Sequence, residues 1–371
     1  MIEYIDQNAE AIILIVVVVL TIISTIVFIG AIYSRWMLRL AESKSKKIRQ
    51  QLSPLVIQYL SGDIEFDDLK KHLSTKTDYQ ILLKISNELD KDLEGEEEKK
   101  LKRLLNLKPI REFFTSRFES GDPLDAARAC IYFAKKDKIR DSLIPKLVNN
   151  SSSEYPLLAY SAALAVITHG DANQKEEAIK NLLKNRELSN QALNDIFNEY
   201  QLRSSDNRKT EAELLMSLIK SKEYFPDRTA LMIRTLGELN FYQSASFLLK
   251  EYLAHEEENY NPLIATALID ILSKFGMEEI LKRLHLEFIS SKYRDVRESV
   301  AKALGVFTKK ESVPLLKWLL VDPDFYVRFF AARSLSYYPD LDLKDMQVYG
   351  MSESDWEELV GEIESSNIEG Y

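Results

Sequence analysis

The 371-residue chain is short of the residues that tight turns and covalent cross-links require. It has 11 glycines and 10 prolines, fewer than the roughly 7% and 5% of an average protein. An all-β fold with many tight turns is therefore disfavoured. Its single cysteine, Cys130, excludes an internal disulfide framework and a thiolate-rich metal site. Together with a hydrophobic content of 46%, these shortages predict an all-α protein.

Residues that carry catalytic chemistry are also scarce. The four histidines, His72, His169, His255 and His285, are far apart in the sequence and occupy unrelated positions. The sequence contains no phosphate-binding loop, dinucleotide-binding turn, zinc-protease helix or serine-hydrolase elbow. We therefore expect no enzymatic activity, no cofactor, no metal site and no small-molecule substrate.

Most of the net charge of −9 lies in the last 31 residues, which hold nine acidic residues and one basic residue. The rest of the chain is nearly neutral. Sequence-independent binding to a phosphate backbone needs a basic surface. We expect no nucleic-acid partner.

A long uncharged run lies near the N-terminus, at residues 11–34. Twenty-four helical residues span about 36 Å, enough to cross a hydrocarbon core of about 30 Å. The run is rich in β-branched residues, which are weak helix formers in water, but in lipid every backbone polar group must bond within the segment. The sequence predicts one transmembrane helix.

The residues on either side of this run predict its orientation. Acidic residues alone precede it, whereas Arg35, Arg39, Lys44, Lys46, Lys47 and Arg49 follow it. The positive-inside rule places the C-terminal side in the cytoplasm, behind an inner (plasma) membrane. A cleaved signal peptide is the alternative, but it would have a basic start and a shorter apolar core. We also expect the helix to continue several turns, until Pro54 disturbs it, so that the folded part sits close to the bilayer.

Two consecutive segments near the C-terminus repeat one pattern. Val296-Arg297 aligns with Val327-Arg328, Ala301 with Ala332, and Leu304 with Leu335, a period of 31 residues. Each segment reads as a first helix, and the first is followed by a second helix at 313–320. Arg297, Ala301, Leu304, Arg328, Ala332 and Leu335 are the candidate structural positions of this repeat.

This pattern resembles the HEAT repeat in its short bacterial form. Cys130, Val166, Leu236 and Leu272 occupy the place of Leu304 further upstream, at spacings near the period of paired-helix repeats. The resemblance covers residues 121–340 and implies an α-solenoid of helix pairs that serves as a protein-binding module. The sequence thus divides into a short extracytoplasmic N-terminus (1–10), a transmembrane helix (11–34), a juxtamembrane helical region (35–120), a HEAT-like α-solenoid (121–340) and an acidic tail (341–371).

Two segments are candidates for binding a partner. The first is the aromatic group Tyr326, Phe329, Phe330, Tyr337 and Tyr338, which is either the core of the last repeat or an exposed patch. The second is a short amphipathic helix in the tail, where Ser354 and Glu357 have the spacing of a capping box and Trp356, Leu359 and Ile363 share one face. This helix either caps the repeats or docks on a partner.

The leading hypothesis is a membrane-anchored scaffold or adaptor whose cytoplasmic HEAT-like solenoid binds a protein partner at a bacterial inner membrane. The alternative is a non-catalytic subunit of a membrane enzyme or transport assembly, for example one for envelope polysaccharide synthesis or export. In that case the span packs against partner helices through Thr21, Ser24, Thr25 and Gly30.

Overall fold

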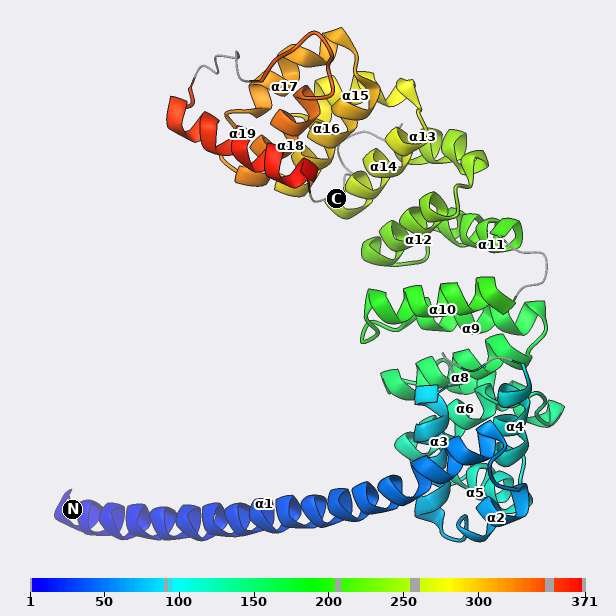
Figure 1. Cartoon of the computed structure of the whole chain (residues 1–371). Helices are drawn as coiled ribbons and strands as arrows, with labels where there is room; N and C mark the ends of the chain where they lie inside the picture. Colours follow the sequence, from blue (N-terminus) through cyan, green and yellow to red (C-terminus); the bar gives the residue numbers. More distant parts are fainter. Residues whose placement is uncertain are drawn as a thin grey trace. The chain divides into compact units, whose positions relative to one another are not determined.

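The computed structural model describes residues 2–89, 93, 95–203, 208–253, 261–343 and 350–368. Every regular element in these ranges is a helix (Figure 1). The chain divides into two compact units, residues 1–138 and 139–371. Each unit is described by itself.

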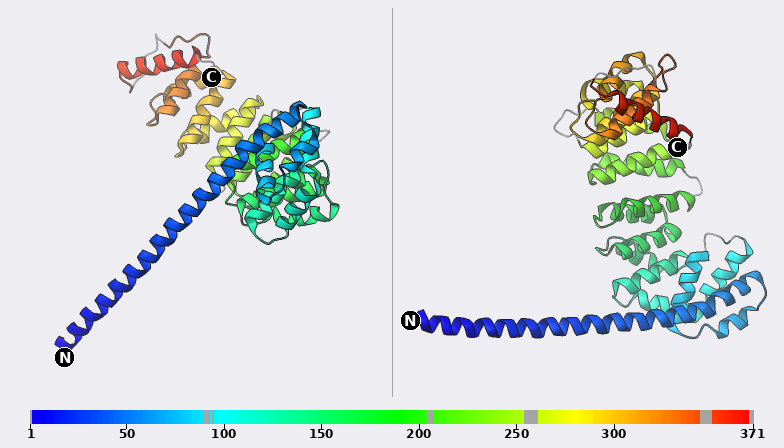
Figure 2. Two further views of the ribbon diagram at one scale, coloured as in Figure 1. Left: turned by 60° about the horizontal axis from the view of Figure 1, so that its bottom comes forward. Right: turned by 60° about the vertical axis from the view of Figure 1, so that its left-hand side comes forward.

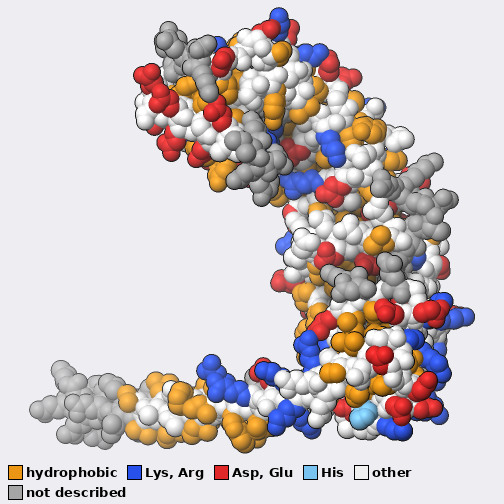
Figure 3. All heavy atoms as spheres, viewed as in Figure 1, with side chains coloured by type: hydrophobic (Ala, Val, Ile, Leu, Met, Phe, Trp, Pro, Cys, Tyr) orange, Lys and Arg blue, Asp and Glu red, His pale blue; other side chains and the backbone are white. Residues whose placement is uncertain are grey.

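The first unit begins with a 60-residue helix, α1 (Ile2–Ser61). Its N-terminal part stands clear of the other helices of this unit in every view (Figures 1 and 2). From Val17 onward, the most apolar 18-residue window of α1 has a mean hydropathy of 2.4 and contains no buried residue. Apolar side chains cover this stretch, and basic side chains follow it toward the folded part (Figure 3). The helix is long and apolar enough to cross a membrane.

Pro54 does not end α1, because the helix continues through it to Ser61. A proline removes one backbone hydrogen bond, to the carbonyl four residues earlier. Here that carbonyl belongs to Gln50, which is exposed, so water can bond it. The last turns are held by packing, since Leu52, Val56 and Tyr59 are buried.

Five shorter helices complete the first unit. They are α2 (Phe66–Lys71), α3 (Lys76–Leu89), α4 (Glu96–Leu105), α5 (Lys108–Phe118) and α6 (Pro123–Ala134). The end of α1 packs against α2, α3 and α4, and α5 packs against α6. Between α5 and α6 the rings of Phe114 and Tyr132 stack with centroids 4.3 Å apart, and the Tyr132 hydroxyl donates a 2.8 Å hydrogen bond to the carbonyl of Leu105.

The second unit consists of α7, a series of helix pairs and a final helix. It opens with η1 (Asp141–Leu143) and α7 (Ile144–Asn150). The first helices of the pairs are α8 (Pro156–His169), α10 (Asn190–Arg203), α12 (Pro226–Glu238), α14 (Pro262–Lys274), α16 (Arg294–Phe307) and α18 (Phe325–Leu335). The second helices are α9 (Ala172–Lys184), α11 (Arg208–Ser221), α13 (Ala245–Leu253), α15 (Leu281–Arg283) with the π-helix η5 (Leu284–Phe288), and α17 (Val313–Leu319). Short 3₁₀ turns, η2 (Tyr242–Ser244), η4 (Glu278–Ile280) and η6 (Lys310–Ser312), lead into α13, α15 and α17. The last described helix is α19 (Glu353–Ile368).

The first helices form the continuous core of this unit. Each contacts the first helix of the next pair, in the order α8, α10, α12, α14, α16 and α18, and α19 packs on α18. The residues in the Leu304 register have no exposed surface: Val166, Leu236, Leu272, Leu304 and Leu335. No pair could bury this apolar face alone, so successive pairs stabilise one another.

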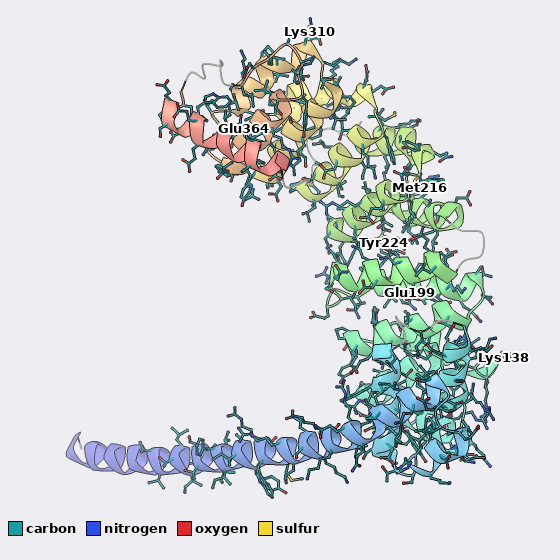
Figure 4. All side chains as sticks on the ribbon, in the orientation of Figure 1. Lys138, Glu199, Met216, Tyr224, Lys310 and Glu364 are labelled. Atoms are coloured by element: carbon teal, nitrogen blue, oxygen red, sulfur yellow. The ribbon has the colours of Figure 1, made fainter. Side chains whose placement is uncertain are left out.

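One carboxyl group is buried among these helices without full hydrogen bonding. Glu211, on α11, is 2% exposed, and its Oε2 atom has no hydrogen-bond partner among the described residues. Burial, and then the charge of Glu238 on α12, raises the pKa of Glu211 to about 7. Glu199, Met216 and Tyr224, labelled in Figure 4, lie on α10, on α11 and just before α12. Glu211 also interacts electrostatically with Tyr200 on α10, so its surroundings come from two consecutive pairs, α10–α11 and α12–α13.

Glu211→Gln is expected to stabilise the protein at pH 8 and to have little effect at pH 5. In the unfolded chain Glu211 ionises near its ordinary pKa of 4.5, whereas in the folded chain it keeps its proton up to about pH 7. The folded state binds more protons in this window, so stability falls as pH rises from about 4.5 to 7. Glutamine removes this loss of stability, which is on the order of 3 kcal/mol. Urea denaturation at both pH values measures it, with the exposed Glu213→Gln on the same helix as the control. An equal effect of Glu211→Gln at both pH values would contradict the raised pKa.

Candidate partner-binding site at the C-terminal repeats

Helix α18 carries four aromatic residues in its first six positions. The Asp324 side chain caps the helix by accepting a hydrogen bond from the backbone N–H of Tyr326 at 2.9 Å. Phe325 is 39% exposed and Tyr326 is 53% exposed, whereas Phe329 and Phe330 are half-buried. The rings of Phe325 and Phe329 stack with centroids 6.2 Å apart. The aromatic segment is therefore neither wholly core nor wholly surface.

Cationic side chains cover these rings. From α16, Arg294 lies 5.4 Å from the ring centroid of Tyr326 and Lys302 lies 3.9 Å from that of Phe330. Arg328 lies 5.8 Å from the ring centroid of Phe325. Cation–π contacts of this kind hold aromatic side chains in place at a surface. Exposed rings next to arginine are typical of protein interfaces.

The two repeat arginines have structural partners. Arg297 forms a bidentate pair with Asp322, at 2.6 and 2.9 Å, and donates to the carbonyl of Ser291 at 2.7 Å. The Asp322 carboxylate raises the pKa of the Arg297 guanidinium. Arg328 donates to the backbone carbonyls of Asp322 and Pro323, at 2.8 and 3.1 Å. Both arginines thus fix the turn between α17 and α18.

The two repeat alanines lie where α16 and α18 meet. Ala301 and Ala332 have no exposed surface. The buried Ser334 hydroxyl on α18 donates a 2.8 Å hydrogen bond to the carbonyl of Ala301 on α16. Small residues at this contact allow the two backbones to approach closely.

Tyr338 and Tyr337 have opposite environments. The Tyr338 hydroxyl donates to the carbonyls of Leu304 and Lys309, at 3.1 and 3.2 Å, and burial raises the pKa of this phenol. Tyr337 is 51% exposed. Of these two candidate partner-binding residues, only Tyr337 is available at the surface, because Tyr338 bonds back to the preceding repeat.

The apolar face of α19 is also unavailable to a partner. Trp356, Leu359 and Ile363 are buried, and the Trp356 Nε1–H donates to the carbonyl of Leu343 at 3.1 Å. Since α19 packs on α18, these residues cover the end of the last repeat. Of the two roles that the sequence left open for this helix, the burial of these residues agrees with the cap, because the exposed apolar edge of a terminal repeat needs such a cover, and contact with a partner stays a prediction.

The start of α19 also differs from the sequence-based prediction. The hydroxyl of Ser352, rather than that of Ser354, accepts a 3.1 Å hydrogen bond from the backbone N–H of Asp355. The capping residue is therefore two positions earlier than predicted. Ser-x-x-acid spacings occur at both serines, and sequence alone does not choose between them.

A cavity of about 370 Å³ lies where the start of α18 meets α19. Val321, Phe325 and Arg328 line one side of it, and Asp355 and Glu358 line the other. The binding residues predicted from the sequence do not include Val321, Phe325, Asp355 or Glu358. The sequence does show an aromatic start to α18 and an acidic helix in the tail. Whether the two lie side by side depends on how α19 packs on α18, which the sequence does not show.

The described residues contain no group of three or more His, Cys, Asp or Glu side chains that could hold a metal ion. The arrangement at the C-terminal repeats offers exposed rings, cations and a small polar cavity, which are features typical of binding surfaces.

Residues 281–345 match the HEAT repeat family. This range contains η5, α16, α17 and α18, the part in which the sequence repeats most clearly. It supports a HEAT-like domain, and HEAT repeats suggest a protein-interaction scaffold. No curated protein matches the chain in sequence.

Proposed function

We propose that the protein is a single-pass membrane scaffold whose helix pairs form a HEAT-like α-solenoid that binds a protein partner at the cytoplasmic face of a bacterial inner membrane. The proposal rests mainly on the exposed apolar segment of α1, which no helix of its own unit buries. An exposed apolar helix of this length is unstable in water and stable in a bilayer. The HEAT-like domain supports the binding role.

The orientation follows from charge. Arg35, Arg39, Lys44, Lys46 and Lys47 are exposed on α1 directly after the apolar stretch. Basic residues remain on the cytoplasmic side of a span. The N-terminus is then outside and the helix pairs are in the cytoplasm.

Because α1 is continuous beyond the apolar stretch, its C-terminal part would also act as a spacer. The helix is exposed or half-buried at the described positions from Ser34 to Gln51, and Leu52 is the first residue of α1 that the structure describes as buried. Eighteen helical residues extend about 27 Å. The folded part would therefore stand off from the bilayer rather than lie against it, in contrast to the sequence-based expectation.

An anchored adaptor accounts better for the span than a subunit that packs among partner helices. The hydroxyls of Thr21 and Thr25 donate to the carbonyls of Val17 and Thr21, each at 2.7 Å. These polar groups are satisfied within α1, so they need no partner helix. The binding function is then assigned to the helix pairs.

Proximity labelling from the C-terminus of the full chain in its membrane tests the proposal. We expect a defined set of labelled cytoplasmic or membrane proteins, compared with an unrelated anchor. Tyr326→Ala with Tyr337→Ala should reduce labelling of the direct partner at least several-fold, because both rings are exposed at the C-terminal repeats. Tyr155→Ala, at an equally exposed tyrosine before α8, is the matched control.

A chain that lacks residues 11–34 separates the two roles. For an adaptor, the soluble chain should still capture the partner in solution but lose its membrane location. Capture that requires the span would instead support the assembly subunit. Labelling that never exceeds the unrelated anchor would refute the scaffold role.

A further inference from the structure

The cavity between α18 and α19 has one aromatic wall and one acidic wall. Phe325 is 39% exposed and Val321 is 43% exposed, so both present apolar surface at its mouth. Asp355 and Glu358, one helical turn apart on α19, contribute carboxylates from the opposite side. The cavity thus has an apolar side at the start of α18 and an acidic side on α19.

The charges that line this cavity are not balanced among themselves. Asp322 is neutralised by its bidentate pair with Arg297, which leaves the cation Arg328, whose Nη1 donates to two carbonyls, and the two carboxylates of Asp355 and Glu358. By contrast, no described cation lies within ion-pair distance of Asp355 or Glu358. Both carboxylates are exposed on α19. The described part of the tail, residues 350–368, contains no lysine or arginine that could neutralise them.

Helix stability alone explains only one of these two carboxylates. An acidic residue in the first turn interacts favourably with the positive end of the helix dipole, which accounts for Glu353 and Asp355. Glu358 lies beyond the first turn. The Asp355 side chain also plays no part in capping, since Ser352 accepts the hydrogen bond from the Asp355 backbone.

We propose that this cavity binds a lysine or arginine side chain from a basic segment of a partner protein. The cation would lie between the carboxylates of Asp355 and Glu358, and its aliphatic stem would pack against Phe325 and Val321. A long side chain with an apolar stem and a charged head matches both walls. Arg328, whose Nη1 donates to two carbonyls, is one cation beside these two carboxylates, so the excess charge in the cavity favours a cationic ligand over an anionic one. The inference rests on the proposed scaffold function and names the chemistry of the partner.

The test measures binding of a fluorescent oligoarginine peptide to the full chain in nanodiscs of zwitterionic lipid. The same peptide with citrulline in place of arginine keeps the shape and removes the charge. We expect the arginine peptide to bind with a salt-dependent affinity and the citrulline peptide to bind at least about tenfold more weakly.

Matched substitutions on α19 distinguish the cavity from the acidic helix as a whole. Asp355→Asn with Glu358→Gln should weaken peptide binding about tenfold. Glu357→Gln with Glu362→Gln makes the same change in net charge on the same helix, outside the cavity, and should weaken binding by less than about twofold. Phe325→Leu, which keeps an apolar side chain but removes the aromatic face, should weaken binding about threefold. Far-UV circular dichroism confirms that each variant remains folded.

If Asp355→Asn with Glu358→Gln and Glu357→Gln with Glu362→Gln weaken peptide binding equally, the proposal is overturned, because binding would then follow net charge alone. Equal binding of the citrulline peptide would overturn it as well. If the double variant proves unstable, Glu358→Gln alone, with Glu362→Gln as its control, gives the same comparison. If the peptide binds specifically but no partner is labelled in cells, the cavity's binding role is supported and the scaffold function is refuted. Partner labelling that survives Asp355→Asn with Glu358→Gln would refute the cavity's role and leave the scaffold function intact.

Discussion

Leu304→Asp is expected to unfold the C-terminal helix pairs, at a cost of about 5 kcal/mol. Leu304 has no exposed surface and lies on α16, which packs between α14 and α18. An aspartate there would bury a charge without a partner, and its neighbours in the array depend on α16 for their own burial. Urea denaturation followed by far-UV circular dichroism should show early loss of part of the helical signal.

Val306→Asp on the same helix is the control. Val306 is 58% exposed, so the same new charge should change stability by less than about 0.5 kcal/mol. Lys302→Asp is a poorer control than its exposed position suggests. Lys302 forms an ion pair with Glu298 at 2.7 Å and covers the ring of Phe330, and both contacts would be lost. Equal denaturation midpoints for Leu304→Asp and Val306→Asp would show that the register is wrong.

Gly305→Ala is expected to destabilise the protein by about 3 kcal/mol, although alanine is the better helix former. A Cβ atom at Gly305 would overlap the Ser334 side chain and lie 3.0 Å from the Ser334 Cα. Because a backbone atom is involved, α18 would have to move away from α16. That movement would also break the hydrogen bond from the Ser334 hydroxyl to the carbonyl of Ala301.

Gly361→Ala provides a control of opposite sign. Gly361 lies within α19 with no neighbouring atom within 4 Å of the new Cβ, so alanine should stabilise the helix by up to about 1 kcal/mol. Gly237→Ala should cost less than Gly305→Ala, since the atoms in its way belong to the flexible side chain of Ile271. A stabilising effect of Gly305→Ala would contradict the close approach of α16 and α18.

The positions of the repeat could be read from the sequence because they depend on local patterning. Leu236, Leu272, Leu304 and Leu335 recur at the period of a helix pair, and the structure buries all of them. Helical content follows from the shortage of glycine and proline, since few positions interrupt a helix. The apolar segment near the N-terminus could also be predicted, because it depends only on the local run of residue types.

The candidate binding site was less predictable because burial depends on what packs against each face. Tyr337 and Tyr338 are adjacent and chemically identical, yet only Tyr338 reaches the carbonyls of Leu304 and Lys309. The apolar face of α19 was recognisable, but its pattern is the same for a cap and for a docking helix. The cavity depends on where α19 meets α18, which no local pattern specifies.

The sequence by itself determined the helical class, the repeat register, the apolar segment and the acidic tail, because composition and periodicity set each of these. Only the tertiary structure decided that α1 continues through Pro54, since packing of Leu52 and Val56 outweighs the lost hydrogen bond. It also decided that Trp356 is covered and Phe325 is not. These outcomes depend on contacts between residues far apart in the chain, whose free energies exceed the local preferences of any one segment.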